Sequence, residues 1–155
     1  MTGKVIEILL AANAGDTLDP YPSAKLEAGK GIIGDRYHST QGTFSEKLKG
    51  APGLEVTLIE QEQINAFNAT TNLNYSNGDF RRNIVTENID LNALVDKEFY
   101  IGLVKLKGIL LCEPCAYLAK RLDQQIIELM THKAGLRAQI LVSGNIAISD
   151  TIYSI

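Results

Sequence analysis

Cys112 and Cys115 are the only cysteines of the 155-residue chain, and they form one Cys-x-x-Cys pair in the stretch KGILLCEPCAYLAKRL. This spacing suits two metal ligands, a dithiol couple, or a reactive thiol with a companion. It also suits two small buried side chains, because unpaired cysteine is commonly found in protein cores. The rest of the sequence has to distinguish these roles.

Metal and dithiol chemistry both lack partners in this sequence. A structural zinc site takes four ligands, and the only imidazoles, His38 and His132, stand far apart without the histidine spacing of zinc modules. A strand, Cys-Glu-Pro-Cys and a helix in this order are similar to the layout of thioredoxin. However, Pro114 is the last proline of the chain, so no later proline can lie beside the pair. A thioredoxin-like oxidoreductase is therefore not expected.

The proline between the cysteines favours one reactive sulfur. Proline suits the first position of a helix, which would put Cys115 in the first turn of a helix that follows Pro114. Unpaired N–H groups there favour a thiolate over a thiol. The same segment is compatible with two buried core thiols, so both alternatives stay open at this point.

Basic residues gather in further clusters that could bind an anion. Arginine side chains and loop N–H groups suit a phosphate or another oxyanion. The clusters are Arg81 and Arg82 in FRRN, His132, Lys133 and Arg137 in HKAGLRA, and Asp35, Arg36 and His38 in GKGIIGDRYH. Each cluster alone is also typical of a solvated surface. No Ser-His-Asp pattern, His-Glu-x-x-His motif or dinucleotide fingerprint accompanies them.

The hydrophobic pattern predicts many short strands and a few short helices. Strands are expected at residues 4–12, 55–59, 83–86, 99–108 and, as a pair, 136–155, whereas loops dominate 13–53. Ile64 and Phe67 recur at helical spacing, and a later helical stripe from 118 to 129 has a break at 123–124. Gly102 suits a bulge, and 143–145 suits a turn between the last two strands. We therefore predict a single domain, 1–155, that is mainly β and barrel-like, or α+β by some counts.

Composition limits the class of protein. The formal net charge is −3, which argues against a general nucleic-acid binder. Two cysteines cannot build a disulfide scaffold, and no apolar run approaches the length that crosses a bilayer. Glu7 interrupts the apolar start, so we interpret this segment as the first strand and not as a signal peptide. These features predict a cytoplasmic protein without nucleic-acid or membrane partners.

Several stretches in the same order resemble the MOSC domain, the C-terminal module of molybdenum cofactor sulfurase. They are GIIGDRYH…GTFS, PGLEVTLIE, RRNIVTENIDLNALV, FYIGLVKLKGILLCEPC and HKAGLRAQILVSGNIAISDTI, and the resemblance as a whole spans roughly Lys4 to Ile152. The resemblance implies a β-rich, barrel-like fold. It also implies that Cys115 carries sulfur or meets the molybdenum cofactor as a molybdenum ligand. Cys112 is then a resolving thiol or simply a small residue at a strand end.

The resemblance also implies residues that hold the cofactor. Arg82 and Asn83 match the strand-head arginine and asparagine of the family. Residues 133–138 read Lys-Ala-Gly-Leu-Arg-Ala where the family has Arg-Gly-Gly-Leu-Arg-Ala, which keeps the charge and replaces one glycine. The cofactor-binding residues expected from these stretches are Arg82, Asn83, His132, Lys133, Arg137, Asp35 and His38.

The function implied by the resemblance is that of a molybdenum-cofactor-associated sulfur carrier or sulfurtransferase, with a persulfide or the cofactor on Cys115. One alternative is a molybdenum-dependent reductase of N-hydroxylated compounds. It would need an electron-transfer partner, because the sequence has no flavin, haem or iron–sulfur motif. Another alternative is a non-catalytic, redox-sensitive binding module. The chain has no pyridoxal-phosphate motif and no room for the desulfurase domain of the eukaryotic sulfurase, so a sulfur donor such as a cysteine desulfurase is expected to act in trans.

Overall fold

The chain forms eleven strands, most of them short, in the computed structural model, which describes all 155 residues. The strands are β1 (Thr2–Leu10), β2 (Asp19–Pro20), β3 (Ser23–Glu27), β4 (Gly31–Ile32), β5 (Val56–Glu60), β6 (Ile84–Glu87), β7 (Glu98–Ile101), β8 (Val104–Leu111), β9 (Leu136–Val142), β10 (Gly144–Ala147) and β11 (Thr151–Ser154). The α-helices are α1 (Gln61–Thr71), α2 (Ala116–Arg121) and α3 (Gln125–Leu129). Short 3₁₀ helices are η1 (Pro52–Leu54), η2 (Asn77–Phe80) and η3 (Leu91–Leu94).

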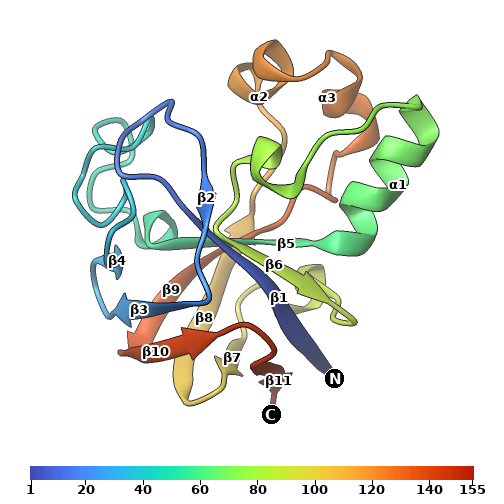
Figure 1. The fold of residues 1–155 in the computed structure, drawn as a ribbon. Coiled ribbons are helices and arrows are strands. Elements are labelled where there is room, and N and C mark those ends of the chain that lie inside the picture. The colour runs from blue at the N-terminus through green and yellow to red at the C-terminus, as the bar shows by residue number, and fades with distance from the viewer.

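Most of the strands close into a barrel. Around the barrel the order is β1, β11, β7, β8, β9, β5 and β6, and β6 pairs with β1 again. Only β5 and β6 run parallel, because α1 forms part of the crossover between them (Figure 1). β2 pairs with the end of β1, and β10, β3 and β4 form a separate small sheet. The closed ring confirms the predicted mainly β, barrel-like fold.

The period-two alternation of β8 fills the barrel interior. Val104, Leu106 and Gly108 are buried, whereas the residues between them are half-buried. The interior core contains 20 buried residues, and every strand of the ring contributes to it, together with residues of β3, β4, β10, η3 and the segment after β6. Glycine is required at position 108, because a Cβ there would lie 2.1 Å from the carbonyl oxygen of Leu94.

A second core lies between the outer face of the barrel and the helices. It contains Ile59 of β5, Val85 of β6, Phe67 of α1, Leu118 of α2 and Ile126 of α3, all buried. Burial of such side chains contributes about 1.5–3 kcal/mol each. This packing holds α2 and α3 over one end of the barrel (Figure 1) and fixes the start of α2 beside the strands.

Three local predictions are wrong. Gly102 is not a bulge, because it lies with φ 57° in the turn between β7 and β8. The last strands do not form one hairpin across 143–145, since β9 pairs with β5 and β8 while β10 pairs with β3. Pro114 does not occupy the first position of α2. It precedes the helix, and Cys115 is the N-cap with extended backbone.

Other local predictions are confirmed. The helical stripe is divided at 123–124 into α2 and α3, and Ile64 and Phe67 are the buried residues of α1. The loop-rich stretch 13–53 contains only the short strands β2, β3 and β4 and the start of η1. None of the helices has the length and apolar character needed to cross a membrane.

Candidate functional site

A cavity of about 210 Å³ lies against the outer face of the barrel. Thr57 of β5 and Arg137 of β9 stand directly opposite each other on the paired strands. Both line the cavity, because their neighbours Leu58 and Leu136 occupy the barrel interior and successive strand residues face opposite sides. The loop between β4 and η1 and the start of α2 contribute the remaining walls.

Positive charge dominates the cavity lining. Glu113 is the only carboxylate residue of the wall. The cationic residues of the wall are Arg36, Arg81, Arg82, Arg137 and Lys47. A chain with a net charge of −3 has therefore concentrated cations at this one place, which suits an anionic ligand.

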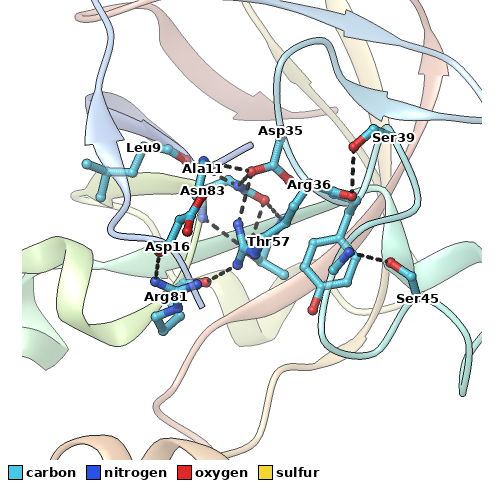
Figure 2. Close-up of polar contacts among 12 residues, drawn as sticks. Leu9, Ala11, Asp16, Asp35, Arg36, Ser39, Ser45, Thr57, Arg81 and Asn83 are labelled. Atoms are coloured by element: carbon cyan, nitrogen blue, oxygen red, sulfur yellow. Dashed lines mark hydrogen bonds and ion pairs between the residues drawn. The ribbon is translucent and has the colours of Figure 1, made fainter. Parts of the chain in front are cut away.

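Arg36 is the one cation of the wall that has a carboxylate partner. Its Nη1 donates to Oδ1 of Asp35 at 3.0 Å, and the two side chains are almost completely buried. Its Nη2 donates to the carbonyl oxygen of Arg81 at 3.4 Å (Figure 2). The charges of Arg36 and Asp35 compensate each other, whereas the other cations of the wall have no carboxylate partner.

Arg81 and Arg82 are buried cations that contact only backbone oxygens. Arg81 is 7% exposed and donates to the carbonyl oxygen of Asp16. Arg82 is 8% exposed, and donates from Nε to Ala134 O at 2.9 Å and from Nη2 to Cys112 O at 3.1 Å. Neither forms an ion pair in the chain.

Burial of a charge without a counter-ion costs free energy, so a bound anion would stabilise these two arginines. Burial, together with the nearby charge of Arg36, lowers the pKa of Arg81. A guanidinium nevertheless stays protonated in proteins. The site therefore keeps two buried positive charges that a phosphate or another oxyanion would compensate.

The two cysteines line the same cavity, and no disulfide joins them. Cys112 is 2% exposed, and its backbone is fixed on both sides: its N–H donates to Gly135 O at 2.8 Å and its carbonyl accepts from Arg82. Cys115 is half-buried, and its side chain makes no capping hydrogen bond to α2. Cys115 is thus the more accessible sulfur of the pair.

Aromatic rings complete the wall beside the cations. Phe44 and Tyr117 meet edge to face, with ring centroids 6.3 Å apart. The Arg36 guanidinium lies 4.9 Å from the ring centroid of Tyr37, a cation–π distance. The site therefore combines cations, flat apolar surfaces and a thiol, which together suit an anionic ring compound with an affinity for sulfur.

Two residues expected to bind the cofactor form the support behind the cavity instead. Asn83 bridges Thr57, Leu9 and Asp35 through four side-chain hydrogen bonds. Asp35 accepts hydrogen bonds from Ala11 N and Asn83 in addition to Arg36 (Figure 2). Neither residue lines the cavity.

Three other expected residues lie outside the cavity. His38 contacts Glu27 at 3.3 Å and lines a second, separate cavity. His132 is exposed and pairs with Glu113 at 2.6 Å. Lys133 lines a small hollow beside α1 and α3. Of the residues expected from the sequence, the structure brings together the two cysteines, Arg82 and Arg137.

The sequence prediction missed several residues of the wall. Lys47, Phe44 and Tyr117 lie in segments without a recognisable motif, and no local pattern indicates that they meet. Arg36 and Arg81 do stand in basic clusters. The sequence pattern favoured their neighbours Asp35 and Arg82, because it does not show which side chain of a cluster faces the cavity.

A family model for the MOSC domain matches residues 45–153 of the chain. This stretch contains most of the cavity wall, including Arg81, Arg82, both cysteines and Arg137. Among curated protein sequences, none matches this chain significantly.

Solved structures with the same fold come from several bacteria. The YuaD protein from Bacillus subtilis superimposes with a TM-score of 0.81 at 14% identity, and the alignment covers 98% of this chain and 94% of that one. YiiM from Geobacillus stearothermophilus gives 0.75 at 11% identity, covering 99% and 75% of the two chains. YiiM from Escherichia coli gives 0.70 at 16% identity, covering 100% and 70%. At these identities the likeness concerns the fold.

Proposed function

Because the chain belongs to the MOSC domain family, whose function is associated with the molybdenum cofactor, we propose that the cavity beside Cys115 binds a molybdenum cofactor. We further propose that Cys115 is the sulfur that ligates the metal or carries a persulfide.

One observation carries the proposal: two buried arginines without carboxylate partners share a cavity with an accessible thiol. A phosphate accepts paired hydrogen bonds from guanidinium groups. Thiolate is a soft ligand of the kind that binds soft metal centres. The donors present therefore fit a cofactor that has a phosphate at one end and a metal at the other.

Each wall residue has a distinct role in this proposal. Arg81 and Arg82 compensate the anionic end, and Arg137 and Lys47 add charge at less buried positions. Phe44 and Tyr117 supply the apolar surface for a flat ring. When bound, the cofactor supplies a redox-active metal, and the chain holds and orients it.

The sulfur-carrier step needs only Cys115 and a donor. The Cys115 thiolate attacks the terminal sulfur of a persulfide, the donor's S–S bond breaks, and the donor leaves as a thiol after taking up a proton. Cys115 then holds one additional sulfur atom as a persulfide, and no net oxidation occurs. The donor is a protein persulfide of the kind formed on a cysteine desulfurase, acting in trans.

The test compares wild type, Cys115→Ser and the matched control Cys112→Ala after expression with molybdate. We expect molybdenum by metal analysis, or the mass of one extra sulfur atom by intact mass spectrometry, in wild type and in Cys112→Ala. Cys115→Ser should lose both while keeping its thermal melting profile. Retention of molybdenum and of the extra sulfur by folded Cys115→Ser would refute the assignment. So would their absence from all three proteins.

A further inference from the structure

A second cavity of about 490 Å³ lies beside the first and has no role in the function proposed above. Its walls come from the turn between β3 and β4, the loop that precedes β5, and the middle of β9. The volume is within the range of sites that bind small organic ligands. Tyr37 is the one residue that lines both cavities.

Tyr37 is a fixed partition between the two cavities. The Arg36 guanidinium covers its ring at 4.9 Å from the centroid. Gly42 also packs against the ring so closely that a Cβ at position 42 would lie 2.4 Å from Cε1 of Tyr37. A ring packed this tightly does not move aside easily, so the second cavity is a separate compartment.

A buried carboxylate faces this second cavity. Glu55 is only 7% exposed, and its Oε1 accepts from Gly29 N and Ile140 N, each at 3.1 Å. Its Oε2 has no hydrogen-bond partner in the chain. Every fully buried side-chain oxygen or nitrogen does have a partner, so Oε2 is not fully buried. Oε2 must therefore be open to the cavity that Glu55 lines. This atom can accept a hydrogen bond from a ligand.

Cationic groups of the same cavity add a preference for negative charge. Lys30 contacts Glu27 at 3.4 Å, so this carboxylate offsets its charge, and His38 contacts the same carboxylate at 3.3 Å. Lys49 has no ion pair in the chain. The cavity thus contains a free carboxylate acceptor, Glu55 Oε2, and one uncompensated cation, Lys49, beside the neutral amide of Gln139.

A simple anion does not match this combination, because the Glu55 carboxylate repels it. Burial raises the pKa of the Glu55 carboxyl, which adds to the benefit of a hydrogen-bonding partner there. The matching ligand needs an N–H donor for Glu55 and an anionic group for Lys49. Pro52, Leu54 and the ring of Tyr37 add apolar surface that suits a flat ring between these polar ends.

We propose that the second cavity is a binding site for a nucleoside monophosphate whose base carries an exocyclic amine. The amine donates to Glu55 Oε2, the base lies against the apolar wall, and the phosphate pairs with Lys49. The inference is independent of the molybdenum-cofactor proposal, because it uses none of the cationic residues of the first cavity.

Calorimetric titration with AMP, GMP and CMP tests the inference, with IMP and UMP as matched probes that lack the exocyclic amine. We expect at least one aminated nucleotide to bind wild type with a Kd below about 1 mM. Its counterpart without the amine should bind about tenfold more weakly or worse, since a hydrogen bond to a charged group contributes about 1.5–3 kcal/mol. The corresponding nucleoside, without phosphate, should also bind more weakly.

Variants locate the binding. Glu55→Gln keeps an oxygen acceptor for Gly29 N and Ile140 N, so it should fold. It places an amide NH₂ where Oε2 was, so it should bind the aminated nucleotide at least about tenfold more weakly than wild type. Lys49→Ala is the second variant and should also weaken binding. Lys133→Ala, outside both cavities, should not.

Arg137→Gln separates this inference from the proposed function. It changes only the wall of the first cavity and should leave nucleotide affinity unchanged. Loss of nucleotide binding in Arg137→Gln together with wild-type binding in Glu55→Gln would place the nucleotide in the first cavity and overturn the inference. Absence of binding by every aminated nucleotide at millimolar concentration would overturn it as well. Neither result would bear on molybdenum or sulfur at Cys115.

Discussion

Asn83 should be a stability residue, although its sequence position suggests a ligand contact. Its Oδ1 accepts from both the N–H and the hydroxyl of Thr57, and its Nδ2 donates to Leu9 O and to Oδ1 of Asp35, all at 3.2 Å. The side chain is 2% exposed and ties β5, β1 and the loop after β4 together (Figure 2). We therefore expect its replacement to weaken folding directly.

The hydrogen bonds of Asn83 give the expected loss in the free energy of unfolding. A typical intramolecular hydrogen bond contributes about 1 kcal/mol net, so the loss of these bonds in Asn83→Ala predicts about 3–4 kcal/mol, allowing for water that enters the space. Asn83→Asp should cost more at neutral pH. It keeps the acceptor for Thr57 but puts a carboxylate oxygen in place of the amide that lies 3.2 Å from Asp35.

Urea unfolding monitored by circular dichroism measures this prediction. Asn145→Ala is the control, because Asn145 is exposed and makes no side-chain hydrogen bond, and it should change the free energy of unfolding by less than about 0.5 kcal/mol. An Asn83→Ala variant that loses less than about 1 kcal/mol would refute the reasoning. So would an Asn83→Asp variant as stable as wild type.

Two further predictions concern glycine and burial. Gly135→Ala should destabilise the fold by about 3 kcal/mol or more, because φ is +116° and a Cβ would lie 2.1 Å from Leu58 O. Gly15→Ala, with φ +81° and nothing within 4 Å, should cost only about 1–2 kcal/mol in the same urea unfolding assay, and equal losses for the two variants would contradict this prediction. Burial raises the pKa of Glu55 above its usual 4.5, so the folded state keeps the Glu55 carboxyl protonated to a higher pH than the unfolded state does. The folded state therefore loses stability as the pH rises from 4.5 through the folded-state pKa of Glu55. When the pH is raised from 4.5 to neutrality, the free energy of unfolding should therefore fall less for Glu55→Gln than for wild type, as measured by urea titration at each pH. Equal changes with pH in the two proteins would contradict this prediction.

Sequence pattern predicted the elements better than it predicted their partners. The alternation of β8 and the stripe of α1 depend on local burial, which a period of two or 3.6 reports directly. Pairing depends on closure of the whole barrel. The turn at 143–145 therefore resembled a hairpin, although β10 leaves the barrel to join β3. The same non-local packing put His38 in a different cavity from the cysteines.

The cavity wall depends on a backbone feature that no residue pattern reveals. In an extended strand, Arg81 and Arg82 would point to opposite sides. Arg81 instead has φ +67°, a left-handed conformation that is uncommon for residues with a side chain. The alternation is interrupted there, and both guanidinium groups line one cavity. Strained backbone of this kind persists where the surrounding structure holds it, and it clusters at binding sites. Arg81 holds this conformation as the C-cap of η2, where its N–H donates to Gly78 O, so the end of this 3₁₀ helix places two adjacent guanidinium groups on one wall.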